Sequence, residues 1–410
     1  MLRALLIPGF LFILTACGKT EADVSIAQVT INAIVPANTG TVYVTGDNEQ
    51  FGPWNADGLA MTGAGSERSA QITLQPTEEL LYKFTLGEWS REAVDENLFP
   101  YQNFALVAED GMSVTHDIAG FKPPREALLD DWKGSGVLGT LVHETDVPSE
   151  FLELDRNMTI WLPPGYEDPQ HADKRYPVIY MTDGENLFDP RMANTGVDWG
   201  VDEAMMAGVQ AGAFEPAIIV STWSTAQRFE DYSPWHNGMN YARFVTEELK
   251  PRIDQTYRTL TDRENTYAMG SSMGGLLAMY MVTQHADTFS ACGCVSTHVP
   301  LSDQMIAMFT GGDASAADPT PYITKDINEG RFVPAPDVRY FFDYGTEGLD
   351  AMYGPVHAEL QAHFTALNRQ DGEDFLIRLY PGADHNETSW RARVGDQLLW
   401  LLAGQAPDED

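Results

Sequence analysis

The chain has 410 residues, which is too many for one ordinary hydrophobic core and enough for two domains. Hydrophobic residues make up 43% and aromatic residues 11%, which excludes a disordered chain and is typical of a folded globular protein. The net charge of −35 argues against nucleic acid or an anionic membrane surface as a partner, because phosphates would be repelled. We attribute the acidity to solubility.

The first residues read as a targeting segment. A short basic start, Met1 to Arg3, precedes an apolar run, Ala4 to Leu14, that is too short to span a bilayer and predicts a signal peptide. Leu14 to Cys17 then resembles the lipobox of bacterial lipoproteins. The resemblance implies that Cys17 becomes the first mature residue and carries lipid, so the membrane is contacted only through this anchor. Gly18 favours an outer membrane destination, facing the periplasm or the cell surface. An ordinary cleavable signal with an incidental cysteine is the alternative.

Residues 24–120 are predicted to form an all-β module. Short runs with strand character, such as TVYVTG and LLYKFTLGEW, are separated by Gly, Asn, Asp and Pro, and no helical periodicity extends over a useful length. A β-sandwich fits this pattern. Residues 121–145 contain KPP and GSG and are predicted to be a linker with some helix.

From residue 146 to residue 404, strand-like and helical stretches alternate, before an acidic tail at 405–410. This alternation predicts an α/β fold with a mostly parallel sheet and helices on both faces. Cys292 and Cys294 lie two residues apart in an apolar run, where a disulfide is hard to form, so both are expected to be buried free thiols. The cysteines show no zinc pattern, and no metal or other cofactor is expected.

The stretch YAMGSSMGG indicates a nucleophilic serine. Gly270-Ser271-Ser272-Met273-Gly274 matches the G-x-S-x-G elbow, in which a strand turns sharply into a helix and leaves one side chain at the apex. The residues two before and two after that apex come too close for a β-carbon. Ser272 has glycine at both positions and Ser271 has methionine, so Ser272 is the candidate. The amide of Met273, at the helix start, would face the developing oxyanion.

The other members of a triad should follow in the order Ser, acid, His. GTEGLDAMY, just past a strand, offers Glu347 and Asp350 as the acid, and the sequence leaves both open. His385 lies in the loop after the next strand and is the predicted base. His298 also follows a strand end, but it precedes the acid in the chain and is expected at most to line the pocket.

A second oxyanion donor is expected in an earlier loop. The strand at residues 176–181 leads into Thr182 to Asp189, where Gly184 permits a tight approach and the Glu185 amide is the candidate donor. An ordinary Asp-Gly turn is the alternative interpretation.

Together, WLPPGY, YPVIYMTDGENLFD, the serine elbow, DYGTEGLD and GADH resemble the putative-esterase family of α/β hydrolases over roughly residues 145–403. Relatives in that family include esterase D, enterochelin esterases, feruloyl esterases and mycolyltransferases. The resemblance implies a Ser–His–acid triad without a metal and supports Ser272, His385 and the amides of Met273 and Glu185. Many relatives have aspartate in a G-T-N-D-x-x-Y pattern. In this chain Asp350 keeps the D-x-x-Y spacing, whereas Glu347 lies nearer the Gly-Thr.

The N-terminal module resembles starch-binding-type carbohydrate-binding modules. Trp54 and Trp89 match the aromatic positions on which such modules stack a sugar ring. The alternative is that Trp54 packs in the core and that the module is only a scaffold.

The sequence thus predicts a lipid-anchored serine esterase acting on esters of carbohydrates or other small extracellular esters. Transfer of the acyl group to a sugar or alcohol, and a glycan-binding lipoprotein with an inert hydrolase domain, are the alternatives. The substrate and the oligomeric state are not readable from the sequence. The predicted segments are a signal peptide (1–16), a lipidated tether (17–23), the β-module (24–120), the linker (121–145), the hydrolase domain (146–404) and the tail (405–410).

Overall fold

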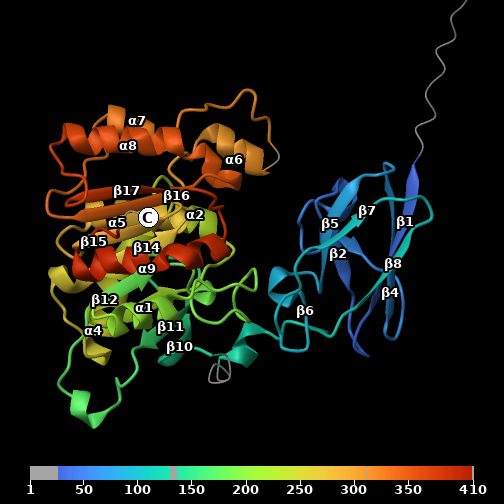
Figure 1. The fold of residues 1–410 in the computed structure, drawn as a ribbon, viewed down its shortest axis with the longest axis horizontal. Coiled ribbons are helices and arrows are strands. Elements are labelled where there is room, and N and C mark those ends of the chain that lie inside the picture. Colours follow the sequence, from blue (N-terminus) through green and yellow to red (C-terminus); the bar gives the residue numbers. More distant parts are fainter. Residues whose placement is uncertain (1–25, 130–135, 311, 409–410) are drawn as a thin grey trace, which may run out of the picture. The chain divides into compact units, whose positions relative to one another are not determined.

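The computed structural model describes residues 26–129, 136–310 and 312–408. The described residues form two compact units: one contains 26–87 and 102–119, and the other contains 88–101 together with the described residues from 120 onward (Figure 1). The signal peptide, the tether and Cys17 lie outside the described residues. Within the described ranges, no helix is long and apolar enough to cross a membrane.

The first unit is a β-sandwich, as the sequence predicts. Its two sheets have the orders β4-β1-β8 and β3-β2-β5-β7. Side chains alternate between buried and exposed along β1 and β4, as expected for strands with one face in a core. The Tyr82 hydroxyl on β5 lies 2.7 Å from Nε2 of His116 on β8, so the two sheets meet face to face. The strands are β1 (Ala27–Ile34), β2 (Tyr43–Gly46), β3 (Leu59–Ala60), β4 (Glu67–Leu74), β5 (Glu79–Thr85), β7 (Phe104–Val107) and β8 (Ser113–Asp117).

The predicted module boundary is wrong for residues 88–101, which belong to the second unit. In this segment β6 (Ala93–Val94) pairs with β9 (Gly120–Phe121). The Lys122 ammonium, almost fully buried, lies 2.9 Å from a carboxylate oxygen of Glu92 and donates a 2.6 Å hydrogen bond to the carbonyl of Ala193. A buried ion pair and a backbone contact therefore hold the segment within the hydrolase unit.

The second unit is built on an eight-stranded sheet with the order β10-β11-β13-β12-β14-β15-β16-β17. Its first two strands are antiparallel to their neighbours and the rest are parallel, which confirms the predicted fold class. Residues 140–145, assigned by the sequence to a linker, form part of β10 and pair with β11, so the sheet begins earlier than predicted. The strands are β10 (Thr140–Val147), β11 (Arg156–Leu162), β12 (Val178–Met181), β13 (Ile218–Thr222), β14 (Thr266–Ser271), β15 (Ala291–Val295), β16 (Arg339–Gly345) and β17 (Phe375–Tyr380).

Helices cover both faces of this sheet. Successive strand residues point to opposite sides, and both sides carry apolar side chains that the helices bury. Tyr180 belongs to the apolar core that contains helix α5, whereas its neighbour Ile179 belongs to the core that contains residues of α1 and α9. Cys292 and Cys294 are buried free thiols on the α5 side, as predicted. The helices are α1 (Val201–Gln210), α2 (Arg228–Tyr232), α3 (Gly238–Arg243), α4 (Lys250–Thr256), α5 (Met273–Gln284), α6 (Asp303–Thr310), α7 (Tyr322–Asn328), α8 (Gly354–Ala366) and α9 (Glu387–Ala403), with a π-helical segment (Phe244–Leu249) between α3 and α4.

Candidate active site

Ser272 stands at a sharp turn between β14 and α5. Its φ of 54° and ψ of −121° lie in a region that non-glycine residues rarely adopt. A β-carbon on Gly270 would come within 2.5 Å of the Thr182 hydroxyl, and one on Gly274 within 2.2 Å of the same oxygen. The two elbow glycines therefore allow the loop that follows β12 to lie directly against the serine turn.

Ser272, His385 and Asp350 form one hydrogen-bonded series. His385 Nδ1 lies 2.6 Å from Asp350 Oδ1, and His385 Nε2 lies 2.9 Å from Ser272 Oγ. An ionised carboxylate can only accept, so Nδ1 carries the proton and Nε2 is free to accept one from the serine hydroxyl. This is the arrangement of a nucleophile, a general base and the acid that orients it.

Of the two acids that the sequence left open, Asp350 is the one that contacts His385. It lies in the turn η9 (Gly348–Met352) and its side chain is fully buried. Glu347 is exposed, and its backbone amide donates to the carbonyl of Ala383.

Asp350 is held by a buried polar network that the sequence did not reveal. Its Oδ2 accepts from the Gly345 amide at 2.8 Å and from the Ser296 hydroxyl at 2.5 Å, and Ser296 in turn accepts from Arg393 at 2.6 Å. Arg393 also donates to Asp343 at 3.0 Å. Burial alone would raise the pKa of Asp350, but the hydrogen bonds from His385 and Ser296 outweigh it and lower the pKa below its usual range.

The only signal for this network in the sequence is Asp343, a charged residue inside the apolar run of β16, RYFFDYG. A buried charge at such a position needs a partner. The sequence does not indicate that Arg393, fifty residues later, is that partner.

Both candidate oxyanion donors lie at the turns that the sequence indicated. Met273 is the first residue of α5, so its amide has no acceptor in a preceding helical turn. Glu185 belongs to the short turn η6 (Gly184–Asn186), which follows Thr182 and therefore begins beside the elbow. The Glu185 carboxylate is buried and accepts from the Ser224 amide at 3.0 Å and from the Ser224 hydroxyl. Burial and the nearby Asp183 raise its pKa.

His298 lies beside the triad without joining the hydrogen-bonded series. Its amide donates to the Ser272 carbonyl at 3.1 Å, and its Nδ1 lies 2.5 Å from the Tyr353 hydroxyl. Its ring centroid is 6.4 Å from that of His385. Burial, with the neighbouring His385, lowers the pKa of His298 to about 3, so the ring is neutral near pH 7.

The two tryptophans singled out for sugar binding belong to different units, Trp54 to the sandwich and Trp89 to the hydrolase unit. Each is half-buried. Neither is therefore a fully buried core residue.

Known proteins resemble this chain over the hydrolase unit and, in fold, over most of its length. Residues 149–401 match the family described as "Putative esterase". Ferri-bacillibactin esterase BesA of Bacillus subtilis is 28% identical over 142 residues (30% of this chain and 48% of that protein), and the uncharacterized protein YbbA of the same organism is 22% identical over 161 residues (36% and 59%). This chain thus spans about half the length of these curated relatives. The structure of the enterobactin esterase FES from Shigella flexneri, with 2,3-di-hydroxy-N-benzoyl-serine, covers 92% of this chain and 93% of its own, at 15% identity and a TM-score of 0.50. Because the family match extends over more than half of its residues, the chain belongs to the putative-esterase family of α/β hydrolases.

Proposed function

We propose that this protein is a serine carboxylic-ester hydrolase that works through an acyl-enzyme intermediate. The hydrogen-bonded series of Ser272, His385 and Asp350, with the serine at a strained turn, is the observation that carries the proposal. Membership of an esterase family supports it.

In the proposed reaction His385 Nε2 takes the proton from the Ser272 hydroxyl as its oxygen attacks the ester carbonyl. The amides of Met273 and Glu185 donate to the oxyanion, and such donors contribute about 10²–10³ each in rate. His385 then gives the proton to the departing alcohol. A water molecule, activated by the same imidazole, releases the acid. Asp350 keeps the imidazole in the productive tautomer throughout.

We propose esters of carbohydrates or other small extracellular esters as the substrates. The names of the relatives, a ferri-bacillibactin esterase and an enterobactin esterase, make siderophore esters a natural class to include. Partial exposure of Trp54 and Trp89 is compatible with sugar binding. Rates on a panel of acetyl-sugar, feruloyl, siderophore and simple alkyl esters would choose among these classes, and uniformly negligible rates would contradict the proposal.

A lipid anchor at Cys17 and an outer-membrane location remain part of the proposal, supported by the residues Leu14 to Cys17. Detergent-phase partitioning tests the anchor. A Cys17→Ser variant that still enters the detergent phase would argue against it.

The decisive experiment compares two adjacent serines with a short-chain nitrophenyl ester. Ser272→Ala should lose hydrolysis and fluorophosphonate labelling. Ser271→Ala should keep most activity, because the Ser271 hydroxyl is buried and has no hydrogen-bond partner among the described residues. Full activity in Ser272→Ala, or wild-type protein that takes no label, would refute the proposal. Predominant transfer to an added alcohol would redirect it to acyl transfer.

A further inference from the structure

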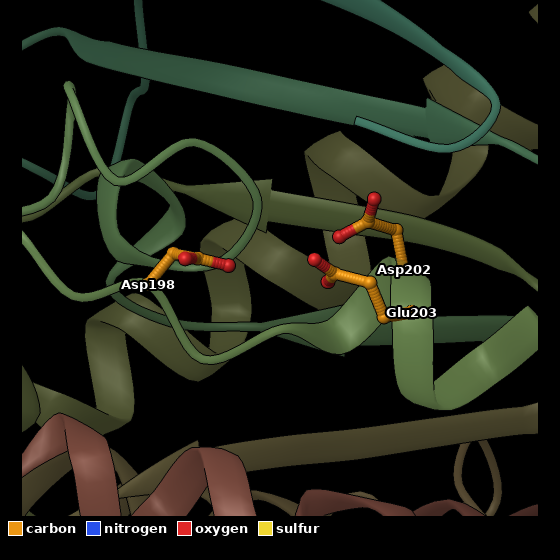
Figure 2. A group of neighbouring side chains, drawn as sticks. All are labelled: Asp198, Asp202 and Glu203. Atoms are coloured by element: carbon orange, nitrogen blue, oxygen red, sulfur yellow. The ribbon is translucent and has the colours of Figure 1, made fainter. Parts of the chain in front are cut away.

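Three carboxylates converge where the loop that follows the oxyanion turn η6, residues 187–200, enters α1. Asp198 comes from the loop, and Asp202 and Glu203 from the first turn of the helix, and Figure 2 shows the three side chains turned toward one another. One carboxylate oxygen from each residue lies within 4.8 Å of the other two. None of the three takes part in the Ser272 hydrogen-bonded series.

Protein donors satisfy only part of this cluster. Arg391 on α9 donates to Asp198 at 2.6 Å and to Glu203 at 2.7 Å. The Gly200 amide also donates to Asp198 Oδ2 at 2.9 Å, and the Leu138 amide donates to Asp202 Oδ2 at 2.7 Å. Three carboxyl groups thus face one guanidinium. Burial, with the adjoining Glu203, raises the pKa of Asp202 to about 8, so a proton on Asp202 relieves part of the negative charge when no cation is bound.

Two carboxylate oxygens in this cluster receive no hydrogen bond from a protein donor among the described residues. Asp202 Oδ1 and Glu203 Oε2 are buried and have no hydrogen-bond partner within the part of the chain that the structure describes. The Asp202 side chain is 0% exposed, so bulk water does not supply the missing partner. Two facing carboxylate oxygens without a protein donor are costly to bury unless a shared proton or a cation lies between them.

We propose that Asp198, Asp202 and Glu203 form a binding site for a divalent cation of the calcium type. Calcium takes oxygen ligands at about 2.3–2.6 Å, so ligands on opposite sides of one ion are about 4.6–5.2 Å apart. The three oxygens lie within 4.8 Å of one another, which is close enough for one such ion to contact them all. Magnesium demands near-ideal octahedral geometry and usually keeps several waters, so a cluster of three carboxylates suits the more flexible coordination of calcium better. With only three protein ligands and Arg391 nearby, we expect weak binding, at about 10⁻⁴–10⁻³ M.

The position of the site gives the cation a structural role. The Trp199 amide donates to the carbonyl of Asn186 in the oxyanion turn at 2.9 Å. On the other side, Trp390, next to Arg391, packs edge-on against both Trp199 and His385, with centroid separations of 5.4 and 5.2 Å. An ion at this position would fix the loop that carries Asp198 to the first turn of α1, because all three proposed ligands lie in these two segments.

The test is thermal unfolding of EDTA-treated full-length protein with added CaCl₂. About 5 mM should raise Tm by about 2–5 °C, because a ligand that binds only the folded state stabilises it. NaCl at equal ionic strength controls for screening of the acidic surface. Asp173→Asn, which removes an exposed loop carboxylate, should keep the response.

Asp202→Asn retains the shape of the side chain and lets it donate to Glu203, so it should fold and lose the calcium response. If Asp202→Asn does not fold, Glu203→Gln decides, because that side chain is 44% exposed and tolerates change. No calcium shift in the wild type, as expected if Asp202 and Glu203 share a proton, would overturn the proposal. A shift kept by the folded variants would overturn it too. Hydrolysis by the EDTA-treated protein is measured separately, so this proposal and the esterase proposal fail independently.

Discussion

The contact between the serine elbow and the oxyanion loop can be tested by adding one methyl group. In Gly274→Ala the new β-carbon would lie 2.2 Å from the Thr182 hydroxyl oxygen, whereas ordinary contacts begin at 3.4 Å. One of the two segments must therefore move by about 1.2 Å. Overpacking of this kind costs about 1–3 kcal/mol, which corresponds to a fall of about 4–8 °C in Tm for a cost near 2 kcal/mol.

The loss of activity should exceed the loss of stability. Thr182 leads directly into the turn that carries Glu185, so the displacement separates the nucleophile from one proposed oxyanion donor. A misplacement of about 1 Å can cost about 10²-fold, and we expect a fall of that order in kcat/KM on a nitrophenyl ester. Steady-state kinetics and thermal unfolding on the same preparations provide both numbers.

A second substitution separates this explanation from general damage. Thr182→Ala removes the clashing oxygen, which has no hydrogen-bond partner among the residues described. The nearest atom to the new methyl group is then the β-carbon of residue 182, at 3.2 Å. The double variant should recover most of the activity lost in Gly274→Ala. Gly395→Ala in α9, where a β-carbon meets nothing within 4 Å, is the matched control and should be neutral or slightly stabilising. Wild-type kcat/KM and Tm in Gly274→Ala, or no rescue by Thr182→Ala, would refute the reasoning.

Two further predictions concern the surroundings of the triad. Asp350→Asn should lower kcat by about 10³–10⁴, because the amide favours the wrong imidazole tautomer, whereas Glu347→Gln should keep near wild-type kcat; the reverse order in a direct comparison would move the acid to Glu347. Burial lowers the pKa of His298 to about 3 in the folded state, whereas in the unfolded chain it is about 6.5. Between these pH values the unfolded chain binds a proton that the folded chain does not. The stability due to neutral His298 is therefore complete above about pH 6.5 and is lost as the pH falls toward 3. Urea unfolding at pH 7 and pH 5 should show a smaller difference for His298→Gln than for the wild type, and an equal difference would count against a buried neutral ring.

A site residue could be predicted from the sequence where its neighbours along the chain determine its geometry. Glycine spacing singled out Ser272 because the steric demand of the elbow is local, and the contacts of Gly270 and Gly274 with Thr182 account for that demand. Chain order pointed to His385. The D-x-x-Y spacing favoured Asp350 but left Glu347 open, because the choice depends on which carboxylate turns inward, and spacing alone does not fix that direction.

The strand order and the buried polar network depend on residues that are far apart in the sequence. The alternation of strands and helices predicted the parallel sheet, because strands buried on both faces read as short, nearly continuous apolar runs between the helical stretches. The edge strand β10 was missed because one of its faces is polar, and its run, TLVHETDV, resembles a loop. Arg393 could not be assigned because its partner Asp343 lies fifty residues away in sequence.

The chain passes between its two units three times, near residues 87, 101 and 119, and this has a consequence for synthesis and for dissection. Residues 88–101 leave the ribosome well before Ala193, whose carbonyl binds the Lys122 ammonium that pairs with Glu92. At about 5–20 residues per second, this contact can form only about 5–20 s later. A hydrolase cut out from residue 120 or 145, as the family match at 149 would suggest, removes Glu92. If the cut spares Lys122, its buried ammonium loses its carboxylate, a change that typically costs about 3–5 kcal/mol. The boundary suggested by sequence similarity therefore does not coincide with the boundary of the compact hydrolase unit.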